Sequence, residues 1–392
     1  MKKVMILDWG FFSRESTVSA FQELGYEVVF FKHAAYQERV SSDFEEAYNQ
    51  FIDKASPDLC FSWNYYPVLS EACHKAGMLY ISFLYDNPYV MLYSYTLAYE
   101  TNRVFLFDRH EYKVFARGGL QNVYYMPLPG DPSFRDLQCR QPYDPKRVEA
   151  EISFVGGLYN EQHNFYEMME KQGDKYLNGY LEGVMDAQHL IYGSSLIGDT
   201  LTPEILEHLQ KAFPYEPDRG SIEAPSYIYE NYLICRKLTS KERFRYLQLI
   251  GSAFPGKCRL YTLDQSVFIP GVRNMGIAEY TSEMPQVFRH SKINLNFTLR
   301  SIVSGAPLRV LDIMACGGFL LSNYQEDMAE MFVPNEEVVL FESDEDMLDK
   351  IAYYLEHDKE RKEIARAGRE RIKRDYNFVE TFRKILEISG EI

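Results

Sequence analysis

Short apolar runs alternate with longer amphipathic stretches through the first third of the chain, and this alternation limits the fold more than any other feature. The runs cover residues 4–7, 27–31, 59–63, 79–84, 104–107 and 123–126. They are near-continuously apolar, which is typical of strands buried on both faces of a sheet. Helical stretches lie between them, at residues 15–24, 43–54, 67–75 and 109–117. Gly25, Gly77, Gly118 and Gly119 follow helix ends, where a C-terminal cap favours glycine. The pattern predicts a parallel, doubly wound α/β sheet.

A second strand–helix series follows a connector rich in proline and glycine, PLPGDPSF, at residues 127–134. The connector and the polar residues after it predict a domain boundary at about 128–150. The new strands are expected at 151–155, 259–263, 292–297, 319–322 and 338–341. The new helices are expected at 283–290, 307–316, 325–332, 344–356 and 359–374. Residues 160–250 have a mostly helical pattern with no clear strand. This stretch is too long for a simple crossover, so it predicts an inserted helical subdomain.

The 392 residues therefore predict two domains. We expect an N-terminal Rossmann-like domain over 1–140 and a C-terminal one over 150–375, with the helical insertion in the second. The amphipathic terminal stretch, 376–392, is expected to pack back onto the first domain.

Charge and apolar patterning disfavour several classes of protein. The net charge is −15, which disfavours nucleic acid as a partner. No run approaches 18 apolar residues, so no membrane span is expected. The first apolar run is short and ends at Asp8, which disfavours a signal peptide. Six cysteines without a CxxC pair are typical of a reducing cytoplasm. The loop at residues 8–10 lacks GxGxxG, which argues against a dinucleotide-binding dehydrogenase.

The loop at residues 300–306 is the strongest candidate site. A strand leads into it and a helix follows, with Pro307 in the first helical turn, where proline is favoured. The free amides at such a helix start, together with the helix dipole, bind anions. Flanking arginines can donate two hydrogen bonds to a phosphate. The candidate anion-binding residues are Arg300, Ser304, Gly305, Ala306 and Arg309.

Further candidates surround this loop, and each has a simpler structural alternative. Asp312 shares a helix face with Arg309, where it could bind ribose hydroxyls or simply form an intrahelical ion pair. Gly156 and Gly157 follow a strand and could contact a phosphate or only form a turn. Arg273 and Tyr280 could contact the base or phosphate, or belong to a plain loop.

Several segments resemble one known family. The string SGAPLRVLDIMACGGFLLSNYQED at 304–327 resembles the core motif of the spore-maturation CgeB-like glycosyltransferases, which belong to the GT-B clan and have a glycosyltransferase group 1/4-like C-terminal domain. The resemblance extends over most of the chain outside about 165–255. Its other segments are SFLYDNPY (82–89), VFLFDRHEY (104–112), QNVYYMPLP (121–129), EISFVGGLYNEQH (151–163) and ERKEIARAGRERI (360–372).

The resemblance implies a GT-B enzyme, with two Rossmann-like domains facing a cleft. It implies transfer of a sugar from a nucleotide-diphospho-sugar, with a UDP-sugar favoured, to a hydroxyl of a spore- or cell-surface glycan or glycoprotein. No metal cofactor is expected, because such enzymes use a helix dipole and basic side chains instead. Related retaining enzymes carry an E-x7-E pattern on this helix. Asp312 falls at its second acid and Ser304 at its first.

The catalytic base is expected in the first domain. Asp86, in the YDNP turn, is the first candidate and Asp8 the second, and each could instead be an ordinary turn residue. Two other functions stay open. One is a catalytically silent GT-B protein that binds sugar nucleotide or glycan in a surface-assembly complex. The other is a GT-B-like epimerase that acts on the nucleotide-sugar itself.

Overall fold

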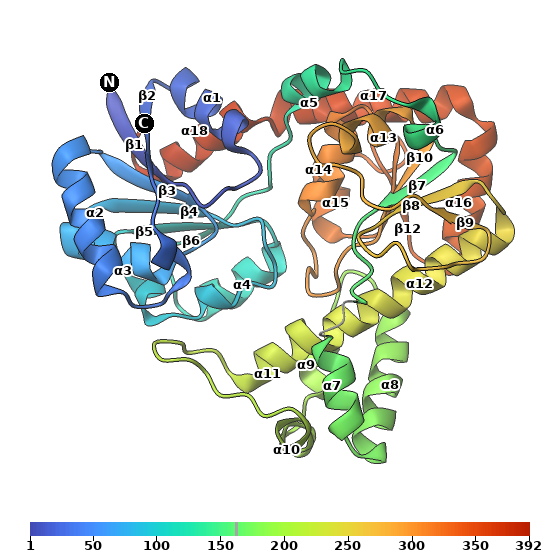
Figure 1. Cartoon of the computed structure of the whole chain (residues 1–392), viewed down its shortest axis with the longest axis horizontal. Helices are drawn as coiled ribbons and strands as arrows, with labels where there is room; N and C mark the ends of the chain where they lie inside the picture. Colours follow the sequence, from blue (N-terminus) through green and yellow to red (C-terminus); the bar gives the residue numbers. More distant parts are fainter. Residues whose placement is uncertain (161–163) are drawn as a thin grey trace. The chain divides into compact units, whose positions relative to one another are not determined.

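The chain forms two parallel six-stranded sheets in a computed structural model that describes residues 1–160 and 164–392 (Figure 1). Each sheet belongs to its own compact unit. Unit 1 comprises Met1–Pro129, Glu216–Pro225 and Tyr376–Ile392, and unit 2 comprises Gly130–Tyr215 and Ser226–Asp375. Residues 161–163, at the end of the EISFVGGLYNEQH motif, lie outside the described residues. Among the described residues, no helix is both long and apolar enough to cross a membrane.

The sheet of unit 1 has the strand order β2-β1-β3-β4-β5-β6. Its strands are β1 (Lys2–Leu7), β2 (Tyr26–Phe31), β3 (Leu59–Trp63), β4 (Leu79–Phe83), β5 (Asn102–Leu106) and β6 (Val123–Tyr125). Each of the six apolar runs of the first third is one of these strands, so the doubly wound prediction is confirmed. Val4 pairs with Val28 on one side and Leu59 on the other, which makes β1 an interior strand. The strand order reverses between β1 and β3.

Helices cover both faces of this sheet. They are α1 (Arg14–Glu23), α2 (Ser42–Ala55), α3 (Pro67–Ala76), α4 (Arg109–Arg117) and α18 (Phe378–Ser389), with short 3-10 turns η1 (Ala34–Gln37), η2 (Val90–Leu92) and η3 (Tyr95–Ala98). Alternate side chains of β3 face opposite layers. Cys60 belongs to the core with Tyr48 of α2 and Leu69 of α3. Phe61 instead packs against Phe21 of α1 and Phe382 of α18, at 5.3 Å between ring centroids in both cases.

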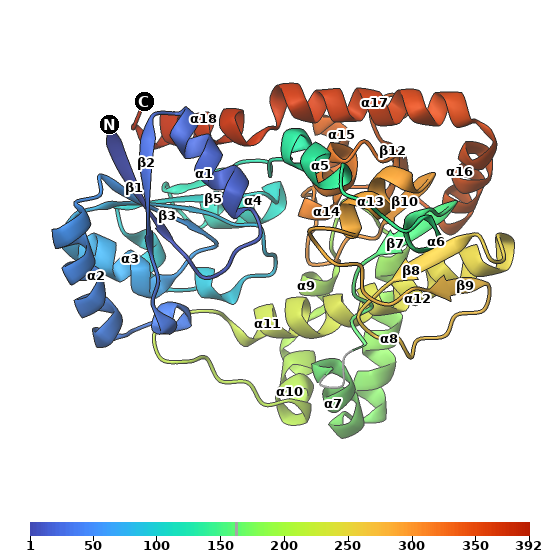
Figure 2. The ribbon, with the colours of Figure 1, turned by 45° about the horizontal axis from the view of Figure 1, so that its top comes forward.

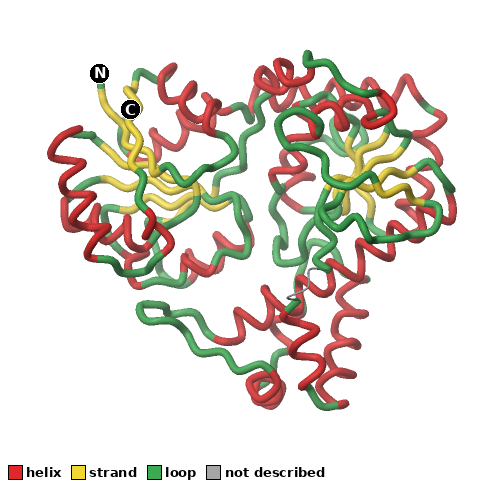
Figure 3. The backbone as a smooth tube through the Cα atoms, in the orientation of Figure 1, coloured by secondary structure: helices red, strands yellow, loops and turns green. Residues whose placement is uncertain are grey.

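The sheet of unit 2 has the order β12-β11-β10-β7-β8-β9. Its strands are β7 (Ile152–Val155), β8 (Cys258–Tyr261), β9 (Val272–Asn274), β10 (Ile293–Asn296), β11 (Leu320–Asn323) and β12 (Val339–Phe341). Figure 3 shows the strands of each sheet between flanking helices. Five of the six strands match predicted runs. The edge strand β9 was not predicted, because it has three residues and no buried side chain.

The helices of unit 2 fall into two groups. Those that cover the sheet include α13 (Met284–His290), α14 (Leu308–Ala315), α15 (Glu326–Met331), α16 (Asp344–Glu356) and α17 (Asp358–Asp375). The inserted helices are α7 (Phe165–Gln172), α8 (Lys175–His189), α9 (Ile197–Thr200), α10 (Pro203–Ala212), α11 (Pro225–Ile228), a π-helical turn η4 (Tyr229–Ile234) and α12 (Cys235–Ala253). Both views show α12 as the element that joins the insertion to the sheet (Figure 2). Tyr246, Leu247 and Ile250 of α12 pack into the core beside Ile152 and Leu295.

The connector between the two sheets is not the turn-rich segment that the sequence predicted. It contains α5 (Pro132–Cys139) and α6 (Pro145–Val148). Asp131 and Asp144 precede the two prolines and act as N-caps, because each carboxylate accepts a backbone N–H of the first turn. Proline is favoured at the first helical position, so these Asp-Pro pairs start helices instead of marking turns.

Candidate functional site

The reversal of strand order in unit 2 brings two loops together at the carboxyl edge of its sheet. β7 and β10 are neighbours, and the chain continues outward from each toward opposite edges. The loop after β7 contains Gly156 and Gly157, and the loop after β10 runs through residues 297–307 to the start of α14. Ligands of doubly wound sheets bind at such a point, because both loops diverge from the sheet there.

Arg243 of α12 connects these two loops. Its Nη1 donates to the carbonyl of Gly157 at 2.5 Å, and its Nε donates to the carbonyl of Phe297 at 3.2 Å. The guanidinium also lies over the ring of Tyr159, 4.8 Å from its centroid. Arg243 is only 9% exposed, so α12 places a buried cation at the point where the strand order reverses.

No carboxylate of the described residues pairs with Arg243 or with Arg309, the arginine of α14. The pKa of Arg243 lies below its ordinary value, mainly because the group is buried and further because Arg309 carries a like charge, despite the opposing effect of Tyr159. The pKa of Arg309 is lowered too, first by burial and then by Arg135, against the effect of Asp312. Arg309 lies over the ring of Phe288 and contacts the sulfur of Met284. Arg243 is buried and Arg309 is half-buried, and cations in such positions without carboxylate partners are costly unless a ligand supplies negative charge.

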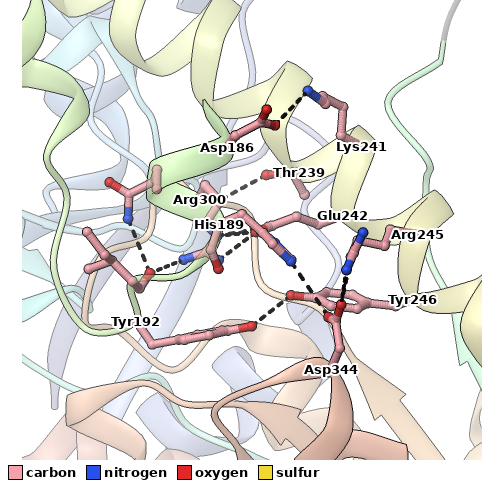
Figure 4. Close-up of polar contacts among 12 residues, drawn as sticks. Asp186, His189, Tyr192, Thr239, Lys241, Glu242, Arg245, Tyr246, Arg300 and Asp344 are labelled. Carbon is pink, nitrogen blue, oxygen red and sulfur yellow. Dashed lines mark hydrogen bonds and ion pairs between the residues drawn. The ribbon is translucent and has the colours of Figure 1, made fainter. Parts of the chain in front are cut away.

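Arg300 is placed differently from Arg309. Its Nε donates to both oxygens of Glu242, at 2.8 and 3.0 Å, and its Nη1 donates to the carbonyl of Ile191 at 2.7 Å. Its backbone N–H donates to the hydroxyl of Thr239 at 2.9 Å. Figure 4 shows these contacts, which join the loop after β10 to α8 and α12. The Arg300 side chain is 11% exposed.

Glu242 is the centre of a wider polar network. Burial would raise the pKa of its carboxyl, but Arg300 and His189 outweigh burial and hold the pKa below its ordinary value. His189 Nδ1 lies 2.9 Å from Glu242 Oε1, and its Nε2 lies 3.6 Å from Asp344. Arg245 pairs with the same Asp344 at 2.5 Å (Figure 4). The network fixes the insertion to the sheet of unit 2.

Asp312 pairs with a residue from the connector. Its Oδ1 accepts a hydrogen bond from Arg135 of α5 at 2.5 Å, and both side chains are 8% exposed. Arg135 also donates to the hydroxyl of Tyr280 at 3.1 Å. Burial is the main reason that the pKa of Tyr280 is raised to about 12. The expected ion pair between Asp312 and Arg309 within α14 is not among the described contacts. Asp312 and Tyr280 instead share Arg135 as a hydrogen-bond donor.

The remaining predicted residues are spread around the two loops. Gly156 donates its N–H to the carbonyl of Tyr261 at 3.0 Å, whereas Gly157 is exposed with open space around its Cα. Ser304, 2% exposed, donates to Asp327 Oδ2 at 3.3 Å, and the N–H of Asp327 donates back to the carbonyl of Ser304. Gly305 and Ala306 are buried beside it, at the start of α14. Arg273 is exposed on the edge strand β9, two strands away from β7.

In unit 1 the two candidate bases lie after β1 and after β4. Asp86 is exposed, and its carboxylate accepts a hydrogen bond from Asn64 Nδ2 at 2.7 Å. The surrounding protein raises the pKa of Asp86 by desolvation, which the bond from Asn64 only partly offsets. Asp8 instead pairs with Arg14 at 3.2 Å and accepts from the N–H of Gly10. A raised pKa suits a side chain that must take up a proton.

Glu111 is a further acid that the sequence analysis did not single out. It lies in the first turn of α4, and Asn87, the residue after Asp86, donates to its Oε2 at 3.2 Å. Desolvation and the charge of Asp108 raise the pKa of Glu111 to about 8. Its signal in the sequence is an acid five residues after Leu106, the end of β5, in VFLFDRHEY. Arg243 had no comparable signal, because it is one of four charged residues in LTSKERFRY.

Comparison with solved structures defines the class of fold. A glycosyltransferase from Rickettsia africae ESF-5 matches with a TM-score of 0.51 and 10% identity, covering 100% of this chain and 98% of that one. HepE of Anabaena, solved with UDP-glucose, matches with a TM-score of 0.54 and 9% identity over 100% of both chains. Sucrose-phosphate synthase from Thermosynechococcus elongatus matches with a TM-score of 0.51 and 11% identity over 100% and 99%. At these identities the matches show the fold, which is GT-B.

The sequence itself matches one family. Residues 233–387, which include Arg243, Arg300 and α14, match a family model described as glycosyl transferase-like. No curated protein matches the chain significantly. The matched family and the GT-B fold together support a glycosyltransferase.

Proposed function

We propose that this protein transfers a sugar from a nucleotide-diphospho-sugar, with a UDP-sugar favoured, to a hydroxyl of a glycan or glycoprotein, in a CgeB-like manner. The observation that carries the proposal is the pair Arg243 and Arg309, a buried and a half-buried cation that have no carboxylate partner among the described residues and lie where the strand order reverses. HepE, which shares the fold, was solved with UDP-glucose, and this favours uridine as the nucleotide.

The chemistry follows from the charge that develops during transfer. When the bond between the sugar and the diphosphate breaks, negative charge grows on the leaving diphosphate. Arg243 and Arg309 would stabilise that charge in a desolvated setting, where electrostatic interactions are strong. The transfer is therefore proposed to need no divalent metal.

The acceptor hydroxyl needs a base, for which we propose Asp86. Glu111 is the alternative base. It accepts a hydrogen bond from Asn87, the residue after Asp86, and its pKa of about 8 also suits proton uptake near neutral pH. An acceptor on the spore or cell surface and an enzyme in the cytoplasm are parts of the same proposal. The acceptor is inferred from the resemblance of the 304–327 segment, and the cytoplasmic location from six cysteines without a CxxC pair.

A thermal-shift comparison of UDP, GDP, TDP, ADP and CDP tests the donor site. A ligand at 100 times its Kd raises the unfolding free energy of the unit that binds it by about 2.7 kcal/mol. For a domain of this size that corresponds to a shift of roughly 5–10 °C. We expect UDP to give the largest shift, and equal shifts for all five would contradict a nucleotide-selective site.

The variant Arg309→Gln separates diphosphate binding from folding. Hydrogen bonds to charged groups contribute about 1.5–3 kcal/mol, so affinity for UDP should fall about 10- to 150-fold. Arg366→Gln is the matched control, because Arg366 is exposed on α17. Unchanged UDP affinity in a folded Arg309→Gln protein would remove this residue from the donor site.

Product analysis then separates the transferase from its two alternatives. Incubation with UDP-sugars and no acceptor should release UDP by slow hydrolysis, and Asp86→Asn should slow transfer to an added glycan. Conversion of the nucleotide-sugar to its epimer without acceptor would point to an epimerase. UDP binding without hydrolysis, transfer or epimerisation would point to a silent binding protein.

A further inference from the structure

A cavity of about 340 Å³ lies at the amino edge of the sheet in unit 2. Lys292 lines it just before β10, and Phe319 lines it just before β11. Gly317, which follows the C-terminal end of α14, forms another part of the wall. Arg309 lies at the opposite end of α14, so the cavity is separate from the proposed donor site. Its volume is at the lower end for small-molecule sites, about 300–1,000 Å³.

Positive charge dominates the lining of this cavity. Arg289, Lys292, Arg361 and Lys362 line it, and Asp358 is the carboxylate among the lining residues. Asp358 forms ion pairs with two basic residues, Arg361 and, at 2.6 Å, Lys362.

The carboxylates just outside the lining are shared in the same way. Asp136 pairs with Arg289 at 2.5 Å and with Arg369 at 2.6 Å. Glu151 pairs with Lys257 at 3.1 Å and reaches Lys292 at 3.9 Å. Six cationic groups thus share three carboxylates around the cavity. Such a surplus of positive charge is unusual in a chain whose net charge is −15.

Helix capping accounts for only part of this surplus. Arg289 donates to the carbonyl of Cys316 at the end of α14, and Arg361 donates to the carbonyl of Tyr354 in the last turn of α16. Basic side chains are favoured at helix C-termini. Lys292 and Lys362 make no such bond, and their side chains are 42% and 72% exposed. These two lysines can therefore turn toward a ligand at little cost.

A buried hydroxyl gives a second, independent indication of a ligand. Ser291 lines the cavity and is 6% exposed, yet its hydroxyl has no hydrogen-bond partner among the described residues. Buried polar groups are nearly always hydrogen-bonded, because an unpaired one destabilises the folded chain. The Oγ atom itself has almost no accessible surface, so a change of the Ser291 rotamer is needed before this hydroxyl can donate a hydrogen bond to an anionic oxygen in the cavity.

We infer that the cavity binds the phosphoryl group of a small phosphorylated metabolite. Lys292 and Lys362 supply charge, and Ser291 donates a hydrogen bond. Phe319 and Ala365 give an apolar wall for the rest of the molecule. The site does not depend on the identity of the sugar donor, because no residue of its lining belongs to the proposed donor site.

Isothermal titration of the full chain with inorganic phosphate and with glucose 6-phosphate tests this inference. The Arg309→Gln variant serves as background, so that binding at the donor site does not contribute. The double variant Lys292→Gln/Lys362→Gln should weaken binding at least about tenfold, which is 1.4 kcal/mol. Lys359→Gln is the matched control, because Lys359 is 90% exposed on the same helix and does not line the cavity.

The variant Ser291→Ala adds a readout that a structural role would not give. It removes a hydroxyl without a partner, so the urea midpoint should not fall, while affinity for the anion should fall several-fold. The inference is overturned if neither anion binds at millimolar concentration. It is also overturned if the double lysine variant binds as tightly as Lys359→Gln. UDP binding to the chain with both lysines replaced should be unchanged, so failure here is distinct from failure of the proposed function.

Discussion

Replacing Arg300 by alanine should unfold unit 2 at much lower denaturant concentration. The substitution leaves Glu242, whose side chain is 6% exposed, as a buried carboxylate whose remaining partner among the described residues is His189. Removing one partner of a buried ion pair costs about 3–5 kcal/mol. The carbonyls of Ile191 and His189 each lose the hydrogen bond from Arg300, although Gln188 still donates to Ile191 at 3.2 Å. We expect a loss of about 4 kcal/mol in the free energy of unfolding of unit 2.

The two tryptophans allow this loss to be assigned to one unit. Trp9 and Trp63 both belong to unit 1, so their fluorescence follows the unfolding of that unit. Circular dichroism follows helices of both units. In a urea titration, Arg300→Ala should move the transition seen by circular dichroism and leave the tryptophan transition near its original midpoint. Separate transitions must be fitted, because a two-domain chain need not unfold in one step.

A double-mutant cycle supplies the control. Arg300→Met/Glu242→Leu replaces both charges by apolar groups, and such replacements are often neutral or stabilising. The double variant should therefore be more stable than either single variant, with a coupling energy of about 3 kcal/mol. A loss below about 1 kcal/mol for Arg300→Ala, or additive losses in the cycle, would refute this account. A stable Arg300→Ala protein that fails only in sugar transfer would instead support a role at the diphosphate.

Three further predictions concern other parts of the chain. Glu223→Ala leaves Arg39 of unit 1 without its carboxylate partner, so the tryptophan transition should lose about 3 kcal/mol, whereas Glu223→Gln should lose less. Folded Glu111 keeps its proton up to a pKa of about 8, far above its ordinary value of 4.5, so the stability of unit 1 should fall as pH rises through this window. Glu111→Gln should flatten that slope in urea titrations at several pH values. Gly368→Ala puts a Cβ 2.2 Å from the carbonyl of Glu337, so it should lower the stability of unit 2 by about 1–3 kcal/mol in thermal unfolding, although alanine favours helices.

The parts of the fold that the sequence predicted are those that depend on local patterning. Strands such as β3 have five buried residues, and their apolar runs stand out against the polar helices around them. The edge strand β9 has no buried residue and pairs on one side only, so its sequence resembles a loop. The sequences of α5 and α6 do contain a helix-start signal, an Asp-Pro pair, but proline alone is common both in turns and in first helical turns. The aspartate before it distinguishes the two.

The candidate site was harder to predict because burial and partner choice are set over long distances in sequence. Arg300 and Glu242 are 58 positions apart, and Asp312 and Arg135 are 177 apart. The motif identified a phosphate-type loop and helix start but could not say which of its arginines already has a carboxylate. Arg309 and Arg300 look equivalent in the sequence. In the described part of the folded chain, Arg300 has an acidic partner, Glu242, and Arg309 has none.

This difference is what makes the charge argument informative. In a chain with a net charge of −15, acids outnumber bases and a buried arginine can readily acquire a carboxylate partner. Arg300 and Arg135 have done so, and both are better explained as parts of the scaffold. Arg243 and Arg309 have not, although burial lowers the pKa of each guanidinium. Because an uncompensated buried charge destabilises the folded chain, these two arginines are best explained by a ligand that brings its own negative charge.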